Sequence, residues 1–306
     1  AIKKLGIKVI LKKQVCKING KGLNGYNYKK NISINAKNSG TLARLITGLL
    51  INSPYKIIIR GDKSLSKRDF NRIAEPLKKF GANLNLNNNK GLPMTIKGSN
   101  KLKAIRYYEK IGSAQCKSSV ILAGLRTDGK TFIKAKKSRN HTELLCKYLK
   151  LPVKIFSKKN YDLIEVKKAN KIKSFNYKIP SDISSSAFFM VLTTLTKDSK
   201  LIIKNVNINP SRIGIITILK KMGVKIIFKN RKIYKGEENA DIKIESPKKL
   251  NPINCPTKLN SEAIDEFLIV FLVAAKANGI SYFKGLSELN QKESPRLKWG
   301  AKILKK

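Results

Sequence analysis

The stretch Lys79-Phe80-Gly81-Ala82-Asn83 ends a run of helical character and begins a run of β-formers. Glycine directly after the last helical turn is the usual left-handed stop of a helix. The same arrangement returns at residues 4–8, 150–154, 221–225 and 298–302, with its central residue 71 to 77 positions apart. We therefore expect an internal structural repeat with a helix stop in every copy. The predicted stops are Gly6, Gly81, Pro152, Gly223 and Gly300.

Each repeat shows the same order of elements before its stop. An apolar helix comes first, followed by a short turn, a strand, a polar loop and a second helix. A pair of strands then fills the space before the next repeat. The first helices are expected at residues 41–51, 115–124, 184–196 and 262–277, and the strands that follow them at 56–60, 130–134, 201–204 and 280–283. Units of the form β-α-β-α-β-β predict an α/β (α+β) fold whose helices pack on sheets.

The polar loops of the repeats lead into helix starts. In the loop 61–68 (GDKSLSKR), Gly61 opens the turn and Arg68 closes it, and Arg212 and Arg296 hold equivalent places in two other repeats. The remaining copy, 138–143 (SRNHTE), begins like a capping box instead. A helix start offers unpaired N–H groups and a positive dipole end, and arginine grips a carboxylate or phosphate with two bonds. We expect anion-binding loops, with a basic surface turn as the alternative for any single copy.

Composition and charge limit the classes of partner that we expect for the chain. The 306 residues are 42% hydrophobic and 27% charged, which is typical of a globular chain of about two domains. The formal charge of +46 rests mainly on lysine, with 55 Lys and 10 Arg spread over the whole chain. No zinc-finger spacing or aromatic ribonucleoprotein motif accompanies it, so we expect no specific nucleic-acid partner. No stretch reaches the ~20 apolar residues of a membrane span, so we expect no membrane partner.

Cysteine and histidine are sparse. Cys16, Cys116, Cys146 and Cys255 lie far apart, which favours free thiols in a reducing compartment, and we interpret this as a cytoplasmic location. His141 is the only histidine and has no nearby cysteine, so no metal site is expected. The chain also lacks a P-loop, a G-x-G-x-x-G turn after a strand and a nucleophile elbow.

Small polar residues recur where the first helix of a repeat begins. Asn38 and Gly40 stand before or at one such helix, Ser113 to Gln115 at the next, and Ser181 to Ser184 at the third. These side chains can cap the helix, or they can bind hydroxyl and phosphate groups of a ligand. Gly40 would let a ligand approach the backbone closely.

Charged residues gather in the C-terminal part of the chain. Asp265 and Glu266 lie near the start of a very apolar helix, where a carboxyl group is disfavoured as an anion and can serve as a base. A helix-dipole partner at the solvent edge is the alternative. Lys292, Glu293 and Arg296 fall within five residues, a spacing that suits proton transfer beside an anionic ligand. A charged surface turn would look the same.

Six of these motifs occur in the order seen in the 3-phosphoshikimate 1-carboxyvinyltransferase (5-enolpyruvylshikimate-3-phosphate synthase) family, which the chain resembles over almost its whole length. They are 38–45 (NSGTLARL), 61–68 (GDKSLSKR), 112–118 (GSAQCKS), 138–143 (SRNHTE), 182–189 (DISSSAFF) and 292–296 (KESPR). The resemblance implies two lobes built from β-α-β-α-β-β units, with residues 1–179 in the first lobe and 180–306 in the second.

The same resemblance implies an activity. The family transfers the enolpyruvyl group of phosphoenolpyruvate to the 5-hydroxyl of shikimate 3-phosphate by addition and elimination. Phosphate is released, and the product leads to chorismate and the aromatic amino acids. No metal or organic cofactor is implied, and a monomer is expected.

Residue roles follow from the resemblance by position. It implies that phosphoenolpyruvate is bound by Gly40, Arg68, Gln115 and Arg296. It implies that shikimate 3-phosphate is bound by Ser113, Ala114, Gln115, Ser138, Asp265 and Lys292. Asn38, which heads the first motif, is expected to contact substrate as well. Asp265 resembles the proton acceptor for the attacking hydroxyl. Glu293, with Lys292 beside it, resembles the acid that protonates the methylene carbon.

The chain departs from the family pattern in three places. The N-terminal Lys-Ser-x-x-x-Arg segment and the C-terminal part with a further arginine and lysine have no counterpart here. Position 295, usually aspartate, is Pro295, which fixes φ and lacks an N–H. We therefore expect an incomplete form with much reduced turnover. Two alternatives stay open: a UDP-N-acetylglucosamine enolpyruvyl transferase, which uses a loop cysteine, and a non-catalytic basic binding protein of the same fold.

Overall fold

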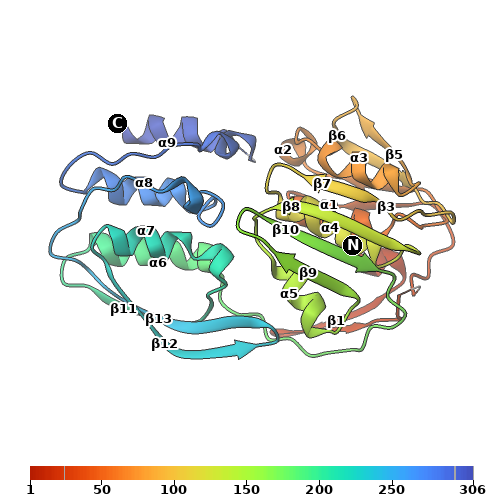
Figure 1. The fold of residues 1–306 in the computed structure, drawn as a ribbon, viewed down its shortest axis with the longest axis horizontal. Helices are drawn as coiled ribbons and strands as arrows, with labels where there is room; N and C mark the ends of the chain where they lie inside the picture. Colours follow the sequence, from red (N-terminus) through yellow and green to blue (C-terminus); the bar gives the residue numbers. More distant parts are fainter. Residues whose placement is uncertain (24, 293, 306) are drawn as a thin grey trace. The chain divides into compact units, whose positions relative to one another are not determined.

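The computed structural model describes residues 1–23, 25–292 and 294–305, and the chain forms two compact units (Figure 1). Unit 1 comprises Ala1–Lys137 and Leu145–Asn176, and unit 2 comprises Ser138–Leu144 and Tyr177–Lys306. The short segment Ser138–Leu144 thus belongs to unit 2, although the chain on both sides of it belongs to unit 1. Each unit has its own buried apolar core.

The first complete repeat of unit 1 forms a four-stranded sheet of order β3-β4-β6-β5. Its elements are β3 (Ile32–Asn35), α1 (Gly40–Leu49), β4 (Ile57–Arg60), α2 (Lys63–Ser66), α3 (Asn71–Lys79), β5 (Asn83–Asn87) and β6 (Gly91–Lys97). β3 and β4 are parallel, since α1 connects them, and the other neighbours are antiparallel. The short helix α2 lies inside the predicted polar loop, so α3 begins three residues after Arg68.

The second repeat of unit 1 has the same topology, with sheet order β7-β8-β10-β9 and β7 parallel to β8. Its elements are β7 (Arg106–Glu109), α4 (Ala114–Gly124), β8 (Lys130–Lys136), α5 (His141–Tyr148), β9 (Val153–Ser157) and β10 (Tyr161–Lys167). A 3-10 helix η1 (Ile2–Leu5) and a hairpin of β1 (Lys8–Lys12) with β2 (Val15–Asn19) precede both repeats. The repeated β-α-β-α-β-β order predicted from the sequence is confirmed in these two copies.

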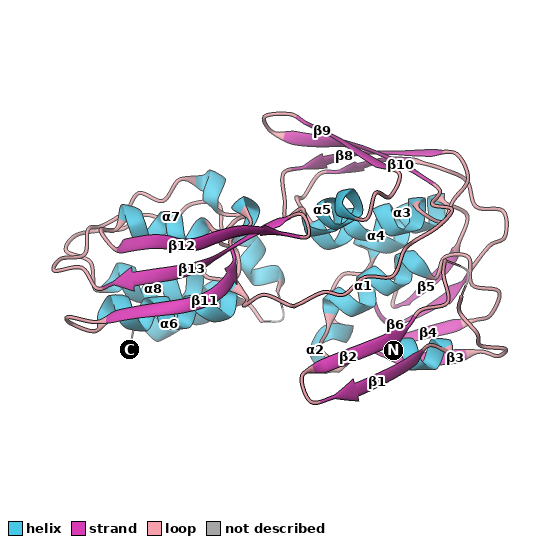
Figure 2. Cartoon of the chain, turned by 90° about the horizontal axis from the view of Figure 1, so that it is seen from below, coloured by secondary structure: helices cyan, strands magenta, loops and turns pink. Residues whose placement is uncertain are grey.

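Helices α1, α3 and α4 lie between the two four-stranded sheets of unit 1 (Figure 2). Helices α1 and α4 approach closely because small residues face each other. A Cβ added to Gly48 of α1 would stand 2.2 Å from the Ser119 carbonyl oxygen of α4. The Ser119 hydroxyl in turn donates a hydrogen bond to the Arg44 carbonyl oxygen at 2.9 Å. These contacts hold the middle of α4 against α1.

Unit 2 contains a three-stranded antiparallel sheet of order β11-β13-β12 with helices packed against it. Its elements are α6 (Ile183–Leu195), β11 (Lys200–Asn207), η2 (Pro210–Arg212), α7 (Gly214–Lys221), β12 (Lys225–Tyr234), β13 (Glu237–Glu245), η3 (Thr257–Leu259), α8 (Phe267–Ala275), η4 (Ser287–Gln291) and α9 (Arg296–Leu304). A parallel bridge between Ser181 and Val206 stands where unit 1 has the first strand of a repeat.

The last predicted strand, 280–283, is reduced to one parallel bridge between Asn254 and Tyr282. Aromatic packing, in place of a full strand ladder, connects residues 280–283 to α8. Phe283 packs against Phe267 and Phe271 of α8, with ring centroids 6.0 and 5.1 Å apart. Phe283 therefore serves side-chain packing, whereas Ile280 and Tyr282 are exposed.

Three of the predicted helix stops are confirmed by left-handed glycines: Gly6 with φ of 76°, Gly81 with φ of 104° and Gly223 with φ of 96°. At the weaker copy, α5 ends at Tyr148 and Lys150 takes the left-handed conformation with φ of 53°. The predicted stop at Gly300 is wrong, because α9 continues to Leu304. Gly300 is buried there, and an added Cβ would stand 2.8 Å from Leu268 Cδ2 of α8.

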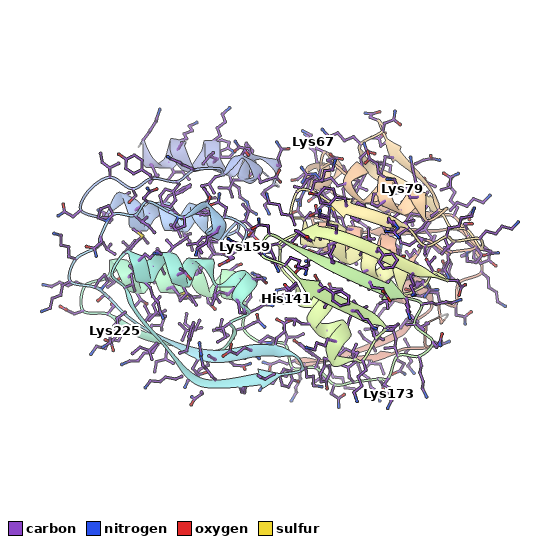
Figure 3. All side chains as sticks on the ribbon, in the orientation of Figure 1. Lys67, Lys79, His141, Lys159, Lys173 and Lys225 are labelled. Atoms are coloured by element: carbon purple, nitrogen blue, oxygen red, sulfur yellow. The ribbon has the colours of Figure 1, made fainter. Side chains whose placement is uncertain are left out.

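Lysine side chains project from many different elements (Figure 3). The lysines labelled there lie next to α2 (Lys67), in α3 (Lys79), between β9 and β10 (Lys159), after β10 (Lys173) and in β12 (Lys225). The positive charge thus does not collect on one element. Of the helices in the described ranges, none is long and apolar enough to cross a membrane.

Candidate functional site

Serine caps open the first helices of both repeats in unit 1. The Ser39 hydroxyl accepts a hydrogen bond from Leu42 N at 3.1 Å, and the Ser113 hydroxyl accepts one from Cys116 N at 3.3 Å. Ala114 is the first residue of α4. Asn38 does not cap α1, because its Nδ2 donates to Asp62 Oδ2 at 2.6 Å. The sequence motifs are therefore real helix starts, with the oxygen of each serine occupied by the backbone.

Five residues at the start of α1 form what we call the α1 cluster: Gly40, Thr41, Arg44, Arg68 and Gln115. A Cβ on the buried Gly40 would stand 2.9 Å from Arg68 Nη1 and 3.0 Å from Arg44 Nη1. Arg44 Nη1 donates to Gln115 Oε1 at 2.6 Å, and Gln115 Nε2 donates to Thr41 Oγ1 at 2.7 Å. Two guanidinium groups and one amide thus converge where Gly40 leaves space.

The α1 cluster is electrostatically suited to an anion. Burial and, after it, the charge of Arg68 lower the pKa of Arg44 to about 10. The Arg44 guanidinium also lies over the Phe70 ring, 5.0 Å from its centroid. Because two cations repel each other here in a partly buried place, a bound carboxylate or phosphate would stabilise both.

Unit 2 holds a second group, the Asp265 cluster, which consists of Asp265, Arg139, Lys292 and Arg296. Arg139 Nη2 donates to Asp265 Oδ2 at 2.6 Å. Arg296 Nη1 and Lys292 Nζ lie 3.0 and 3.5 Å from Asp265 Oδ1. One carboxylate therefore faces three cations, and the cluster keeps a net positive charge.

The cations decide the ionisation of Asp265. Burial alone would raise its pKa, but Arg139, Lys292 and Arg296 outweigh burial and hold the pKa well below the usual range of an aspartate. Burial lowers the pKa of Lys292, and Asp265 opposes that shift. Asp265 is thus an ionised carboxylate whose oxygens are occupied by donors, and an anionic ligand could take some of those donors from it.

Glu266, the next residue, lies in a different environment. It occupies the N-cap position of α8, is buried, and accepts a hydrogen bond from the Ser184 hydroxyl. Arg212 Nη2 donates to the same Ser184 hydroxyl at 2.6 Å and to Asp182 Oδ1 at 3.2 Å. Burial raises the pKa of Glu266, with Ser184 and Arg139 opposing. The pKa values of the two adjacent carboxyl groups, Asp265 and Glu266, are therefore shifted in opposite directions.

Ser138 and the 292–296 motif complete the predicted residues. The Ser138 hydroxyl is buried and, within the described residues, has no hydrogen-bond partner. Pro295 is the N-cap residue of α9 and its carbonyl accepts from Trp299 N at 3.1 Å, so the proline is accommodated in front of Arg296. Glu293, the predicted acid, lies outside the described residues.

A sequence profile of EPSP synthase (3-phosphoshikimate 1-carboxyvinyltransferase) matches residues 1–306. The chain belongs to the EPSP synthase family. It is accordingly a transferase of the shikimate pathway, and its repeated α/β fold is the one that this family shares.

Individual relatives agree with the family assignment. The 3-phosphoshikimate 1-carboxyvinyltransferase of Ruthia magnifica subsp. Calyptogena magnifica is 40% identical over 299 residues, which cover 97% of this chain and 67% of that protein. The enzyme of Thermoanaerobacter sp. (strain X514) is 37% identical over an alignment of 311 residues. That alignment covers 99% of this chain and 72% of that protein. The chain thus spans about two thirds of the length of these relatives.

Solved structures give the same fold. EPSP synthase from Acinetobacter baumannii superposes with a TM-score of 0.85 at 36% identity, over 100% of this chain and 68% of that chain. The enolpyruvyl transferase NikO from Streptomyces tendae has a TM-score of 0.61 at 13% identity, over 90% of this chain and 63% of that chain. The second likeness concerns the fold alone.

Within this EPSP synthase family member, several predicted residues are brought together. Gly40, Arg68 and Gln115 meet in unit 1, and Asp265, Lys292 and Arg296 meet in unit 2. Sequence reasoning missed three other members of these clusters. These are Thr41 and Arg44 in unit 1 and Arg139 in unit 2.

Some of the missed residues had a signal in the sequence. Arg44 follows Gly40 by four residues, so both share one face of α1. Arg139 lies inside the motif 138–143, in which only the neighbouring Ser138 is predicted as a ligand. Arg212, Ser184 and Glu266 are predicted candidates, but the contacts of Ser184 with Arg212 and Glu266 join residues 28 and 82 positions apart.

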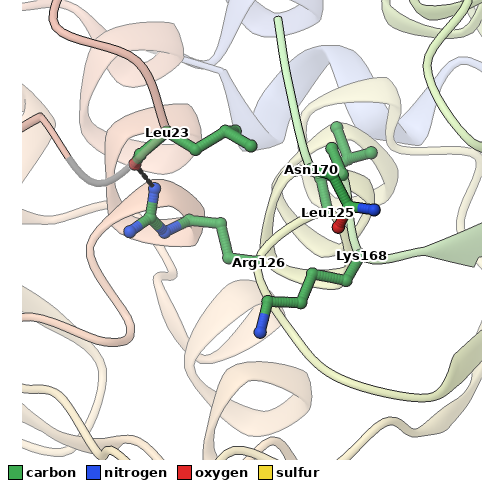
Figure 4. A pocket seen from close by; sticks show the side chains of 6 residues that line it. Leu23, Leu125, Arg126, Lys168 and Asn170 are labelled. Carbon is green, nitrogen blue, oxygen red and sulfur yellow. Dashed lines mark hydrogen bonds between the residues drawn. The ribbon is translucent and has the colours of Figure 1, made fainter.

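A cavity of about 210 Å³ elsewhere in unit 1 contains no predicted site residue (Figure 4). Its lining residues are Leu23, Leu125, Arg126, Lys168, Ala169 and Asn170. The Arg126 guanidinium donates to the Leu23 carbonyl oxygen and to Asn52 Oδ1, and Lys168 pairs with Asp128 at 2.9 Å. These basic groups therefore serve the local structure. Across the described ranges, no group of three or more His, Cys, Asp or Glu side chains could hold a metal ion.

Proposed function

We propose that the α1 cluster and the Asp265 cluster bind the anionic groups of phosphoenolpyruvate and shikimate 3-phosphate, and that the chain's reaction joins these two substrates. The observation that carries the proposal is the placement of three cations within 3.5 Å of one carboxylate, Asp265. A purely structural aspartate would need one such partner. Three partners leave excess positive charge that a dianionic phosphate can neutralise.

The α1 cluster is the proposed phosphoenolpyruvate contact of unit 1. Arg68 and Gln115 supply charge and hydrogen bonds, and Gly40 leaves room because any side chain there would meet two guanidinium groups. Ser113 and Ala114 begin α4, where free backbone N–H groups suit a phosphate or a hydroxyl of shikimate 3-phosphate. The buried Ser138 hydroxyl is a proposed contact of the same substrate, since it has a hydrogen bond to offer.

Asp265 is the proposed proton acceptor. With its three cations it is a weak base, because a proton would have to displace a strong ion pair. A substrate phosphate that draws Arg139 or Lys292 away would raise the pKa of Asp265 and make it a better base. In this proposal, binding of the acceptor substrate activates Asp265 as a base.

The proposed chemistry balances without a cofactor. The 5-hydroxyl oxygen forms a bond to C2 of phosphoenolpyruvate while C3 receives a proton, for which Glu293 is the proposed acid and Lys292 its neighbour. Asp265 receives the hydroxyl proton. A methyl proton then returns to the Glu293 carboxylate, which restores the C2–C3 double bond as the C2–O bond to phosphate breaks, and the proton held by Asp265 passes to the departing phosphate. Arg68 and Arg296 stabilise the negative charge of the departing phosphate.

Isothermal titration with shikimate 3-phosphate tests the proposal, followed by a phosphate-release assay with both substrates. We expect binding by the wild-type chain and weaker binding by Lys292→Met, which keeps the apolar stem and removes the charge. The control Lys298→Met changes an exposed lysine of α9 and should bind like wild type. Absence of shikimate 3-phosphate binding would overturn the proposal.

Two other ligands separate the rival functions. Binding of UDP-N-acetylglucosamine in place of shikimate 3-phosphate would indicate the sister transferase. Binding of single-stranded DNA that weakens steeply with salt, without a response to shikimate 3-phosphate, would indicate a basic binding protein. We propose neither UDP-N-acetylglucosamine nor nucleic acid as a partner. We propose that the chain is a cytoplasmic monomer, and light scattering at several protein concentrations would check the monomeric state.

A further inference from the structure

We propose that Glu237 is a positioning residue of the reaction: through His141 it holds the segment Ser138–Leu144 so that Arg139 meets Asp265. This inference rests on the proposed function of the Asp265 cluster. It assigns a role to a buried carboxylate that contacts neither the cluster nor the predicted ligands directly, and it explains the only histidine of the chain.

His141 Nδ1 lies within hydrogen-bond distance of both carboxylate oxygens of Glu237. His141 is the first residue of α5 (labelled in Figure 3), and its Nδ1 lies 2.9 Å from Glu237 Oε1 and 2.8 Å from Oε2. Glu237 is the first residue of β13 and is buried. Asn207 Nδ2 donates to Glu237 Oε2 at 2.8 Å, so the carboxylate is itself held from β11.

The protonation of the pair follows from its surroundings. Burial would raise the pKa of Glu237, but His141, Asn207 and Asn209 outweigh burial and lower it. Glu237 is therefore ionised, and an ionised carboxylate can only accept hydrogen bonds. His141 Nδ1 must then carry the hydrogen that it donates to Glu237.

A second anchor holds the residue next to Arg139. Asn209 Nδ2 donates to Asn140 Oδ1 at 2.9 Å, and the Ser211 hydroxyl lies 3.3 Å from the same oxygen. The two residues that follow Arg139 are thus pinned to the body of unit 2. Arg139 needs only its own side chain to reach Asp265, where its Nη2 donates at 2.6 Å.

Polar contacts carry this task because apolar ones are lacking. No apolar side chain of Ser138–Leu144 is buried, although the segment belongs to unit 2 by its contacts. The contacts described for Arg139, Asn140 and His141 of this segment are hydrogen bonds and ion pairs. We therefore expect loss of the Glu237 carboxylate to release Arg139 while leaving the apolar core of unit 2 intact.

The test compares Glu237→Ala with the matched control Glu238→Gln. Glu238 is the next residue of β13, and its carboxylate pairs with Arg231 at 3.4 Å. Both substitutions remove one negative charge from the same strand. Glu237→Gln adds a conservative variant, because its amide oxygen can still accept the hydrogen of His141 Nδ1. Urea unfolding of all variants shows which of them keep the native fold.

The first readout needs no substrate. The single histidine gives one set of ring signals in an NMR spectrum, and the Arg139 Nε signal can be assigned by its loss in Arg139→Lys. At one fixed pH, Glu237→Ala should shift both, Glu237→Gln should shift them less, and Glu238→Gln should leave them in place. An unchanged Arg139 signal in a folded Glu237→Ala protein would overturn the inference, whatever the proposed substrates do.

The second readout is a double-mutant cycle on the affinity for shikimate 3-phosphate. Glu237→Ala should weaken binding by roughly 10-fold to 100-fold, as expected for a misplaced binding group. In an Arg139→Ala background the same substitution should have almost no further effect, because the group that it positions is gone. A full effect in that background would overturn the inference. Failure of the wild-type chain to bind would instead refute the proposed function, and the NMR signals would still decide whether Glu237 positions Arg139.

Discussion

Arg139 and Asp265 are 126 residues apart in the sequence, yet Arg139 Nη2 donates to Asp265 Oδ2 at 2.6 Å. This pair joins a seven-residue segment of unit 2 to the turn that precedes α8. Because Lys292 and Arg296 reach the other carboxylate oxygen, cations from two separate stretches of the chain converge on Asp265. Changes at this carboxylate should therefore affect chemistry more than folding.

Replacing Asp265 by asparagine should abolish most of the turnover. The amide keeps the size of the side chain but cannot accept a proton, so the rate of phosphate release should fall by about 100-fold or more relative to the wild-type chain. The control Asp128→Asn changes a carboxylate that is 82% exposed and pairs with Lys168 at the surface of unit 1. It should release phosphate at the wild-type rate. Equal rates for both variants would show that Asp265 is not the base.

Replacing Gly40 by alanine should weaken the affinity for phosphoenolpyruvate. The new Cβ would stand 2.9 Å from Arg68 Nη1 and 3.0 Å from Arg44 Nη1, so both guanidinium groups must move by a few tenths of an ångström or more. Because these are flexible side-chain ends, the fold should persist while the affinity falls by roughly 10-fold. Titration calorimetry with phosphoenolpyruvate measures the effect. An affinity equal to that of wild type would argue against binding at the α1 cluster.

Replacing Gly48 by alanine should destabilise unit 1. The added Cβ would meet the Ser119 carbonyl oxygen at 2.2 Å, and a backbone atom cannot rotate away. Helices α1 and α4 must then separate, which should lower the free energy of unfolding by about 1–3 kcal/mol or more in a urea titration. Gly20→Ala is the control, since nothing lies within 4 Å of its added Cβ. A Gly48→Ala protein as stable as Gly20→Ala would contradict the close packing of α1 on α4.

Replacing Glu266 by glutamine should change how stability depends on pH. Burial raises the pKa of Glu266, so between the unfolded value of about 4.3 and the raised native value the folded chain holds a proton that the unfolded chain lacks. The free energy of unfolding of the wild type therefore falls as pH rises through this range, and the glutamine variant lacks that loss. Below about pH 4.3 the effect is absent, because the carboxyl is protonated in both states.

Urea titrations at several pH values measure this difference. The stability of Glu266→Gln minus that of wild type should grow as pH increases above about 4.3. Glu262, whose pKa is also raised by burial, is present in both proteins and cancels. A constant difference across the pH series would mean that Glu266 is not held in its neutral form.

The sequence predicted the fold well where a local rule fixes the structure. Gly6, Gly81 and Gly223 stop helices because each takes a left-handed conformation, and their spacing revealed the repeat. Gly300 follows no such rule. A Cβ there would stand 2.8 Å from Leu268 Cδ2 of α8, so this glycine lies in a close helix contact, and a close contact of this kind has no local signature.

The candidate site was predictable in part for the same reason. Gly40, Arg68, Lys292 and Arg296 fall in motifs that resemble a known family, and the structure brings them into two clusters. The contact of Arg44 with Gln115 joins residues 71 positions apart, and that of His141 with Glu237 joins residues 96 positions apart. Pairings at such separations depend on the sheet and helix packing of the whole unit, so no pattern along the chain could reveal them.

The membership of Ser138–Leu144 in unit 2 has a consequence for gene fission and for chimaeras. A cut at residues 176/177 looks like a natural seam, because unit 1 otherwise ends there. A polypeptide that starts at Tyr177 would nevertheless lack Arg139 and His141, because both residues lie between the two sequence parts of unit 1. Its Asp265 would keep two of its three cations, and Glu237 would be buried without its imidazole. The two units therefore cannot be exchanged between proteins by a single cut. A functional chimaera that receives unit 2 must also receive the seven residues Ser138–Leu144, which are encoded between the two parts of unit 1.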